Sequence, residues 1–594
     1  MIKKFIMTID GQKIEAKEGE TILQVALRNC IDIPHLCAHP DTKVKANCRM
    51  CVVKIKGVNG LQTACSTPVS EGMDVETLTP EIRWARKFNL ELIFGQHVED
   101  CSVCVLDSKC DLLKYRKIYN SKMLRFPDRK INYPIYQFGP IIFDQTKCID
   151  CRNCVEVCPT GYLELKDRGS DINIEPSADK KKDCIACGQC LVHCPVGAIK
   201  SEGEFESVKE IKKILQQKDK TVVVQFAPAI RTSIGEELGL PYGLVVTDLL
   251  TAGLRKLGFH KVFDTSVAAD FTTSEEAGQA VNHIKEGKNL PVFTSCCPSW
   301  VLFIEFNYPE LIKNITTVRS PEIILGGLVK SYWAEKEKID PKKIVMVSVM
   351  PCTSKKIEIE RKEMFIKGNK PVDIVLTTRE LAWMLKDEKI DLEALKPELA
   401  DNPFGDPSGA GVIYGASGGV MESALRTAYY RLTGENLKSV DFKEVRGQEG
   451  IKRAVIKLCK PVKTNSGECI EIKAAVVNEI KNARIILDEL KKDPKKYDFV
   501  EVMACPGGCV GGGGQSLPTN SFIRSKRAAS LYTIDKNKKI RLAHENPAVI
   551  KAYQEYFNDE KICKEVFHTS FHQQKKKPIG RLKRDMKDFK LIKK

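Results

Sequence analysis

The chain of 594 residues contains no uncharged apolar run of about 20 residues, the length that a membrane-spanning helix requires. Its opening stretch, MIKKFIMTIDGQKIEA, turns polar too early for a secretory signal and lacks the Arg- and Ser-rich character of a transit peptide. Only 7% of the residues are aromatic, and they are not interleaved with the basic residues that give a net charge of +17. We therefore expect a cytoplasmic protein that binds neither a membrane nor a nucleic acid, with its excess basic residues on a solvated surface.

Cysteine, in contrast, is abundant, with 24 residues. In a small secreted chain these would indicate disulfides, but here most fall in CxxC runs of a long, cytoplasmic-looking protein, which favours metal binding. At roughly 150 residues per domain, the length allows three or more domains. We predict four, at residues 1–80, 81–125, 138–205 and 206–594.

Residues 1–80 are expected to form a small β-rich domain that begins with a hairpin around an Asp-Gly turn. The stretch GETILQVALRNC follows with helical periodicity. Four cysteines then have the spacing C-x10-C-x2-C-x13-C: Cys37, Cys48, Cys51 and Cys65. Four thiolates also suit zinc, but a long loop wrapping toward a CxxC resembles the plant-type [2Fe-2S] ferredoxin domain.

Residues 81–125 combine an amphipathic helix, EIRWARKFNLELIFGQ, with a second ligand set in HVEDCSVCVLDSKC. The set is His97, Cys101, Cys104 and Cys110. A lone histidine is usually a satisfied polar residue. This one stands four residues before a CxxC, so that one imidazole and three thiolates close a four-ligand site. Spacing alone leaves zinc and an iron-sulfur cluster both open.

Residues 138–205 contain the run C-x2-C-x2-C-x3-C-P twice, as in bacterial two-cluster ferredoxins. In such runs the fourth cysteine of each repeat ligates the other cluster. The repeat therefore predicts one [4Fe-4S] cluster on Cys148, Cys151, Cys154 and Cys194, and another on Cys184, Cys187, Cys190 and Cys158. Several clusters in one chain indicate electron transfer from cluster to cluster. Such a path must end at a site that uses or supplies the electrons.

In residues 206–594, strand-like and helical stretches alternate, which predicts an α/β domain with largely parallel sheets. The strands are expected at TVVVQF, LPVFTSC, KIVMVSVMPC, VDIVLTT and YDFVEVMAC. The helices are expected at EELGLPYGLVVTDLLTAGLRKLG, EEAGQAVNHIKEG, PEIILGGLVKSYWAEKEK and TRELAWMLKDEK, and at ALRTAYYRLTGENL after a GASGGVMES loop.

Three cysteine-bearing turns follow strand-like runs in this domain: TSCCPSW (294–300), MPCTSKKIE (350–358) and EVMACPGGCVGGGGQ (501–515). Open α/β sheets bind ligands at the carboxyl ends of their strands, and glycine lets the backbone approach a bulky inorganic group. Four thiolates are available for one more [4Fe-4S] cluster: Cys297, Cys352, Cys505 and Cys509. Cys296 is then left over.

The three turns resemble the signature loops of the [FeFe]-hydrogenases, and the N-terminal part resembles the clostridial type of that family. The resemblance implies an H-cluster, in which Cys509 also bridges to a diiron subcluster with CO, cyanide and azadithiolate ligands. It also implies a [4Fe-4S] cluster on the His97 set, giving three [4Fe-4S] clusters and one [2Fe-2S] cluster besides the H-cluster. The implied reaction is 2 H⁺ + 2 e⁻ ⇌ H₂. Electrons would come from ferredoxin or a similar redox protein, and maturation proteins would insert the diiron unit.

The resemblance assigns roles inside the three turns. Cys296 corresponds to the thiol that passes the proton, with an inert buried thiol as the alternative. Lys355 corresponds to the lysine that hydrogen-bonds a cyanide ligand. The groups around the diiron unit are matched by Pro228, Ala229, Met350 and Met503, with core packing as the alternative for the methionines. Some relatives have a serine where this chain has Ala229, which offers only its backbone N–H.

In the clostridial relatives a proton relay leads from the cysteine through a glutamate, a hydroxyl residue and a second glutamate. Counting back from Cys296 without gaps places the first glutamate on Glu276, and the hydroxyl residue corresponds to Thr316, a threonine in place of serine. The outer glutamate falls on Gln279, and an amide does not titrate. Either water or a neighbour such as Glu275 or His283 replaces the outer carboxylate, or the relay is slower. For Glu276, an ordinary surface position is the alternative.

Two other functions remain open at this stage. One is a non-catalytic electron-transfer subunit, like the complex I subunit that shares the N-terminal cysteine pattern. The other is an H-cluster subunit of an electron-bifurcating or hydrogen-sensing system. The set of Cys296, Lys355 and four ligand cysteines argues against the first, because electron transfer needs neither a spare thiol nor a buried lysine.

Overall fold

The computed structural model describes residues 3–98, 101, 104–106, 109–122, 125–126, 132–168, 171–202, 206–437, 439–459, 469–576 and 579–582. All predicted site residues lie within these ranges. The chain divides into two compact units. The first unit comprises residues 1–178, 193–200 and 578–594, and the second comprises residues 179–192 and 201–577. The two-cluster repeat is thus divided between the units.

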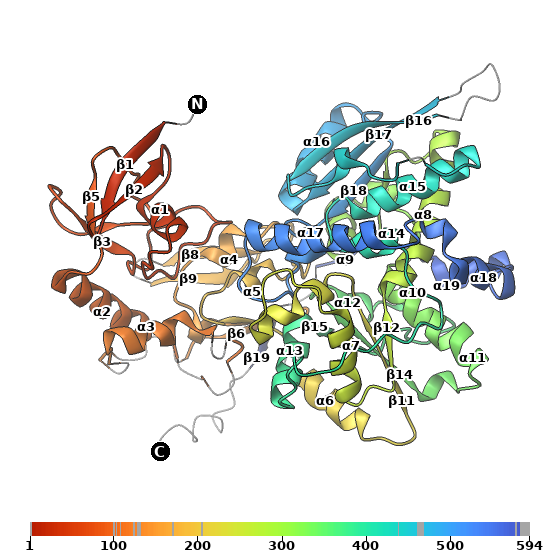
Figure 1. Cartoon of the computed structure of the whole chain (residues 1–594), viewed down its shortest axis with the longest axis horizontal. Coiled ribbons are helices and arrows are strands. Elements are labelled where there is room, and N and C mark those ends of the chain that lie inside the picture. Colours follow the sequence, from red (N-terminus) through yellow and green to blue (C-terminus); the bar gives the residue numbers. More distant parts are fainter. Residues whose placement is uncertain are drawn as a thin grey trace. The chain divides into compact units, whose positions relative to one another are not determined.

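The first unit begins with a five-stranded sheet in the order β2-β1-β5-β3-β4 (Figure 1). Its strands are β1 (Lys4–Ile9), β2 (Gln12–Lys17), β3 (Val52–Ile55), β4 (Gln62–Thr63) and β5 (Asp74–Glu76). The expected hairpin joins β1 to β2, and Asp10 and Gly11 have the positive φ values, 49° and 79°, that its tight turn needs. Helix α1 (Ile22–Arg28) packs its buried face against this sheet.

The rest of the first unit holds short elements around the other ligand sets. These are α2 (Pro80–Phe94), α3 (Asp111–Tyr119), α4 (Asn153–Glu156), β6 (Ile135–Phe138), β7 (Ile141–Asp144), β8 (Leu163–Arg168), β9 (Asp171–Pro176), β10 (Ile199–Ser201) and β19 (Gly580–Leu582). The expected amphipathic helix is α2. Strand β19 pairs antiparallel with β6, so a segment near the end of the chain completes the sheet β10-β7-β6-β19.

The second unit contains two sheets (Figure 1). The first, β12-β11-β14-β15, is wholly parallel, and its strands are β11 (Thr221–Phe226), β12 (Lys261–Asp264), β14 (Ile344–Met350) and β15 (Ile374–Thr377). The central strands β11 and β14 are almost completely buried, which explains their continuous apolar runs.

The second sheet has the order β13-β18-β17-β16. Its strands are β13 (Val292–Phe293), β16 (Ile451–Cys459), β17 (Cys469–Asn478) and β18 (Phe499–Met503). The pairs β13·β18 and β18·β17 are parallel, and β16 closes the edge as the antiparallel arm of a hairpin. The expected mixed α/β architecture is confirmed, with this hairpin as an unpredicted addition.

Helices surround both sheets (Figure 1). Their bounds are α5 (Gln189–Val192), α6 (Glu206–Leu215), α7 (Thr247–Lys256), α8 (Ser266–Glu286), α9 (Pro298–Asn307), α10 (Pro321–Leu328), α11 (Ala334–Lys336), α12 (Lys355–Glu358), α13 (Thr378–Asp387), α14 (Gly409–Val412), α15 (Gly419–Thr433), α16 (Ile480–Lys492), α17 (Ser521–Asn537), α18 (Pro547–Glu555) and α19 (Glu560–Phe567). Within the described residues, no helix combines the length and apolarity needed to cross a membrane.

Three helix boundaries differ from those expected. Helix α7 begins 11 residues after the expected start at Glu236, because Gly239 (φ 92°) and Pro241 interrupt the backbone. Helix α8 begins earlier than expected, since its first residues are buried all round and show no amphipathic period. Helix α15 begins inside the expected GASGGVMES loop, where Gly419 packs so tightly that an added Cβ would lie 1.8 Å from the Ile413 carbonyl oxygen.

Candidate metal centre

The three cysteine-bearing turns of the second unit meet at a cavity of about 80 Å³. Cys297 immediately precedes α9, Cys352 follows β14, and Cys505 and Cys509 follow β18. These turns leave the carboxyl ends of parallel strands, the usual position of ligand sites in open α/β sheets. The structure therefore brings the four predicted ligands together, and Cys296 lines the same cavity.

The donor set fits an iron-sulfur cluster. Burial raises the pKa of all four ligand thiols, and that of Cys509 reaches about 12. Electrostatic repulsion from Cys297 and Cys509 further raises the pKa of Cys352. Buried thiolates need a cation for compensation, and metal binding releases the thiol protons. Four thiols around one cavity thus have the number and chemistry required for a cubane cluster.

The glycines of the third turn bring backbones into close contact. An added Cβ on Gly512 would lie 2.0 Å from the Pro351 oxygen, and one on Gly513 would lie 2.2 Å from the Cys187 oxygen. Gly508 has a φ of 89°, and its Cβ would lie 2.6 Å from the Ser417 nitrogen. The glycine run therefore packs the ligand turns against one another, besides facing the cavity through Gly508 and Gly512.

Lys355 is buried at the cavity wall, with 8% of its surface exposed. Its ammonium donates to Glu358 Oε2 at 2.5 Å, and Glu322 Oε2 lies 3.7 Å away. Burial lowers the pKa of Lys355, but the two carboxylates outweigh burial and raise it, so the side chain is a cation. Burial raises the pKa of Glu322 to about 8. A buried lysine that is ion-paired with Glu358 therefore stands at the cavity wall.

The remaining predicted contacts of the diiron unit also line this cavity: Pro228, Ala229, Met350 and Met503. Met503 packs in one apolar cluster with Ala269, Tyr414 and Cys296. The apolar wall and the lysine together suit a compact anionic group whose ligands are small.

Glu276 and Thr316 lie together, completely buried. Glu276 Oε1 accepts hydrogen bonds from the Thr316 hydroxyl at 2.8 Å and from the Ser295 N–H at 3.2 Å. Burial raises the pKa of Glu276, and Glu276 in turn contributes to raising the pKa of Cys296, after burial itself. The ordinary-surface alternative for Glu276 is wrong, because none of its surface is exposed.

Gln279 and Glu275 occupy the same helix, α8. Gln279 Oε1 accepts from the Thr317 N–H at 3.0 Å. Glu275 contacts His568 Nε2 at 3.2 Å. No sequence pattern pointed to His568, because it lies far from α8 along the chain and contacts Glu275 only in the folded structure. His283, the other neighbour considered, has a buried Nδ1 without a hydrogen-bond partner among the described residues.

Residues 179–192, which carry Cys184, Cys187 and Cys190, belong to the second unit and contact the ligand turns. The Thr353 hydroxyl donates to the Ala186 carbonyl at 2.6 Å, and Gln189 Nε2 donates to the Gly511 carbonyl at 3.0 Å. The Cys505 thiol lies 3.9 Å from the Cys187 carbonyl oxygen. A loop with three predicted cluster ligands is thus in direct contact with the turns that carry Cys352, Cys505 and Cys509.

In the first unit, the four thiols of the N-terminal set gather as two hydrogen-bonded pairs, Cys37 with Cys48 and Cys51 with Cys65. The hydrogen bond with Cys48 lowers the pKa of Cys37 to about 5, against the opposing effect of burial. Cys65 also interacts electrostatically with Cys37. The structure therefore assembles all four predicted ligands of this set.

His97 is buried, and its Nδ1 donates to the Lys147 carbonyl at 2.8 Å. Metal-ligating imidazoles commonly donate one ring N–H in this way, which fixes the tautomer. Burial and the nearby Cys104 and Cys101 raise the pKa of Cys110.

In the two-cluster repeat, Cys151 interacts electrostatically with Cys194, which belongs to the same predicted ligand set. The other set, with Cys158, is divided between the units and stays a prediction.

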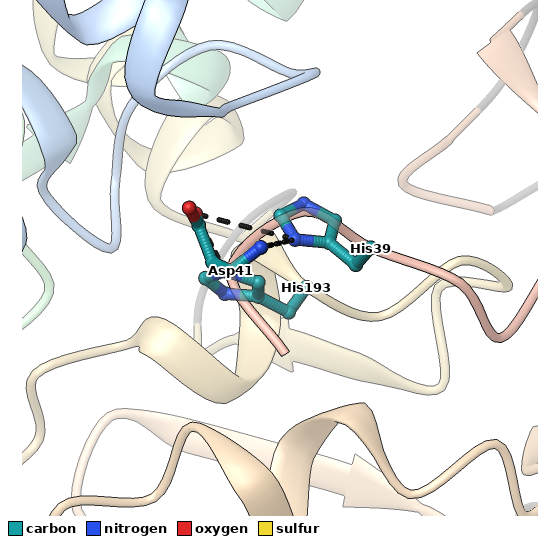
Figure 2. Close-up of side chains that lie close together, drawn as sticks. All are labelled: His39, Asp41 and His193. Atoms are coloured by element: carbon teal, nitrogen blue, oxygen red, sulfur yellow. Dashed lines mark hydrogen bonds and ion pairs between the residues drawn. The ribbon is translucent and has the colours of Figure 1, made fainter. Parts of the chain in front are cut away.

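The ligand loops of the first unit contact each other through His39, Asp41 and His193 (Figure 2). The two imidazole rings lie edge to face with centroids 4.4 Å apart, and Asp41 pairs with His193 Nε2 at 3.3 Å. Nδ1 of His39 already accepts the Asp41 N–H at 3.1 Å, so we assign no ion to this cluster. Because His39 is two residues after Cys37 and His193 adjoins Cys194, the contact joins two predicted cluster sites.

Two buried side chains that the sequence did not single out support the ligand turns. Arg527 donates to the Val510 carbonyl at 2.8 Å and is paired with Glu236. Glu501 accepts from the N–H groups of Gly418 and Met421, each at 2.7 Å, and so fixes the start of α15 beside the cavity. Both residues are completely buried.

Comparison with known families gives four matches along the chain. Residues 220–513 match the iron-only hydrogenase large subunit, C-terminal domain, and residues 521–574 match the iron hydrogenase small subunit. Residues 3–80 match a 2Fe-2S iron-sulfur cluster binding domain, and residues 147–199 match a 4Fe-4S dicluster domain. Fold and site together define an iron-sulfur redox enzyme.

Individual proteins that resemble the chain are also named as hydrogenases. The chain is 38% identical over 567 residues to the NADP-reducing hydrogenase subunit HndD of Solidesulfovibrio fructosivorans, covering 93% of this chain and 95% of that protein. It is 37% identical over 577 residues to Iron hydrogenase 1 of Clostridium pasteurianum, covering 95% and 99%. The apo form of [FeFe]-hydrogenase HydA1 from Chlamydomonas reinhardtii superimposes with a TM-score of 0.56 at 38% identity, covering 62% of this chain and 99% of that one. The chain belongs to the [FeFe]-hydrogenase family, with N-terminal iron-sulfur domains.

Proposed function

We propose that Cys297, Cys352, Cys505 and Cys509 hold the cubane of the H-cluster in this hydrogenase. Cys509 would also bridge to the diiron unit, which supplies the site where hydrogen is formed or split. The observation that carries this assignment is the convergence of four ligand thiols, one spare thiol and one cation on a single cavity. The apolar wall formed by Pro228, Ala229, Met350 and Met503 would exclude water from that cavity, and Lys355 would hydrogen-bond a cyanide ligand of the bound group.

Cys296 carries the proton between the cavity and Glu276 in this proposal. Glu276 Oε2 has no hydrogen-bond partner among the described residues, whereas Oε1 accepts from Thr316 and Ser295. Oε2 is therefore the oxygen open to a proton from the thiol. Burial raises the pKa of this carboxyl, which favours the protonated form that a relay needs.

We further propose that the predicted domains at 1–80, 81–125 and 138–205 carry one [2Fe-2S] cluster and three [4Fe-4S] clusters as an electron path to domain 206–594. The contact of His39 with His193 supports transfer from the N-terminal cluster to the two-cluster repeat. The contact of residues 185–189 with the ligand turns supports the last step. A cytoplasmic ferredoxin would be attracted by the basic surface, with strong salt dependence. Maturation proteins would supply the diiron unit.

A second candidate is the H-cluster subunit of a multisubunit system. It is favoured by the 38% identity, over 93% of this chain, to a protein named as a subunit of an NADP-reducing hydrogenase. Hydrogen-dependent reduction of NADP by the chain together with copurifying subunits, but not by the chain alone, would establish this role. Direct hydrogen evolution from reduced ferredoxin by the chain alone would favour the first candidate.

The deciding experiment is infrared spectroscopy of protein produced with the maturation machinery under exclusion of oxygen, together with hydrogen evolution from a reduced viologen. We expect CO and cyanide bands, gas evolution and about 20 iron atoms per chain, the sum for the proposed clusters. Iron-sulfur absorbance without these bands, despite competent maturation, would contradict the assignment and favour the electron-transfer subunit.

A further inference from the structure

The outer end of the proton relay departs from the family pattern at Gln279, and titratable groups stand beside it. Gln279 Oε1 accepts from the N–H and the hydroxyl of Thr317, at 3.0 and 3.3 Å. The same hydroxyl lies 2.9 Å from His568 Nδ1, and His568 Nε2 lies 3.2 Å from Glu275 Oε2. A continuous set of polar contacts therefore leads from the amide to an imidazole and a carboxylate.

These contacts end at solvent. The side chains of His568 and Glu275 are 24% and 20% exposed. Both line an open cleft of about 740 Å³, together with Gln279 and Thr317. Glu276, one residue further along α8, is completely buried. The pair thus stands between the buried part of the relay and bulk water.

We propose that His568, held by Glu275, is the outer proton-exchange group of this enzyme and replaces the carboxylate absent at position 279. Imidazole is the side chain whose ordinary charge change falls between about pH 5 and 8, and its two nitrogens allow a proton to enter at one and leave at the other. This inference rests on the proposed relay through Cys296 and Glu276.

The transfer balances as a series of single proton hops. In the inward direction a solvent proton enters at Nε2, directly or from Glu275, and the Nδ1 proton passes to the Thr317 hydroxyl. The hydroxyl's own proton leaves through water to the neighbouring Thr316, whose hydroxyl donates to Glu276 at 2.8 Å. The partly exposed ring returns to the starting tautomer by exchange with solvent, in which Nδ1 takes up one proton and Nε2 releases one. Hydrogen oxidation runs the same hops in reverse.

The surroundings keep Glu275 in its role as an anionic partner. Burial raises its pKa, but hydrogen bonds from His568 and the Tyr553 hydroxyl outweigh burial and lower it. The Arg431 guanidinium acts in the same direction. The other charged groups of the cleft are the cations Arg319 and Lys564 and the acid Glu363. Tyr553 holds the second carboxylate oxygen, so Glu275 is a positioning residue that orients the imidazole.

The test compares matured enzyme carrying His568→Gln or Glu275→Gln with Lys564→Gln, which removes a cleft charge outside the contact series. Infrared bands are recorded first. Wild-type CO and cyanide bands in each variant show that the diiron unit is loaded, and their absence from the wild-type enzyme would refute the hydrogenase assignment itself. Glutamine keeps hydrogen-bonding capacity at position 568 but cannot titrate.

We expect hydrogen evolution by His568→Gln to fall about tenfold or more, the usual scale of a lost acid-base group. The pH profile of its rate should differ from that of the wild-type enzyme, and its rate should rise when imidazole is added, because the added base can replace the lost one. The infrared band shift that follows a pH jump should slow by a similar factor. Glu275→Gln should show a smaller loss in the same direction, and Lys564→Gln should stay within about twofold of wild type.

A loaded His568→Gln enzyme with the rate, pH profile and band-shift kinetics of Lys564→Gln, and no response to imidazole, would overturn the proposal. If the His568→Gln variant does not take up the diiron unit, the Glu275→Gln variant tests the proposal in its place. An unchanged pH profile and unchanged band-shift kinetics in that variant would equally overturn it.

Discussion

Replacing Gly512 by alanine should push two ligand turns apart without straining the backbone dihedral angles. Gly512 has φ −61° and ψ 154°, which alanine adopts readily. Its Cβ, however, would lie 2.0 Å from the Pro351 oxygen, where contacts under 3.0 Å essentially never occur. The turns that carry Cys509 and Cys352 must therefore separate by about 1 Å or more. Overpacking of this kind costs about 1–3 kcal/mol.

That displacement also exceeds what a metal site tolerates, since ligand distances vary by only about 0.2 Å. We expect Gly512→Ala to lose the H-cluster, about six of about 20 iron atoms, while the accessory clusters keep their paramagnetic resonance signals. Iron analysis and infrared spectroscopy measure the loss. A variant with full iron content, wild-type bands and unfolding free energy within about 0.5 kcal/mol of wild type would refute the reasoning.

Gly287→Ala is the matched control for this substitution. Gly287 ends α8 with a φ of 64°, and nothing lies within 4 Å of an added Cβ. Alanine there costs about 1 kcal/mol through its left-handed backbone alone. Iron content and infrared bands should be unchanged in the control, so that a loss seen only in Gly512→Ala comes from the turn contact.

Three further predictions address other parts of the molecule. Cys296→Ser should retain the CO and cyanide bands but lose turnover by a factor of about 10² or more, because an alcohol gives up its proton far less readily than a thiol. Arg527→Met should lower the unfolding free energy by about 3–5 kcal/mol in urea titrations, since Glu236 is left buried without its partner. Burial and the Arg431 guanidinium lower the pKa of His544 to about 4, so the neutral form is favoured in the fold. The resulting stability is present above the ordinary value near 6.5 and is lost as pH falls toward 4; His544→Gln should show a smaller drop in urea midpoint between pH 7 and 5 than wild type.

The elements that sequence patterns predicted best are those with a local cause. The Asp10–Gly11 turn, the buried runs of β11 and β14, and the cysteine spacings each carry their signal within a few residues. Helix starts were less predictable. The first half of α8 is buried on all sides, so it has no polar face to mark it, and Gly419 begins α15 because of a tertiary contact.

The site shows the same division. Ligand cysteines were predictable because spacing reflects metal geometry, and the structure gathers Cys297, Cys352, Cys505 and Cys509 as expected. The outer relay was not predictable beyond the absence of a carboxylate at Gln279. Its neighbour His568 comes from the C-terminal segment, where the Val318–His568 bridge and the Arg319 N–H to Phe567 carbonyl bond hold the chain beside α8. Only the folded chain reveals such a contact.

Buried polar groups distinguish catalysis from electron transfer in this fold. Iron-sulfur electron transfer requires buried thiolates and close clusters, but it requires no proton path. Glu276 is nevertheless completely buried, with one carboxylate oxygen lacking a partner among the described residues. Burying such a group costs on the order of 1–3 kcal/mol. Thr316 donates to Glu276, and the next residue, Thr317, contacts His568 at the cleft. Electron transfer would not require these contacts either. This cost, at a position beside Cys296, supports the proposed role of Glu276 in proton transfer.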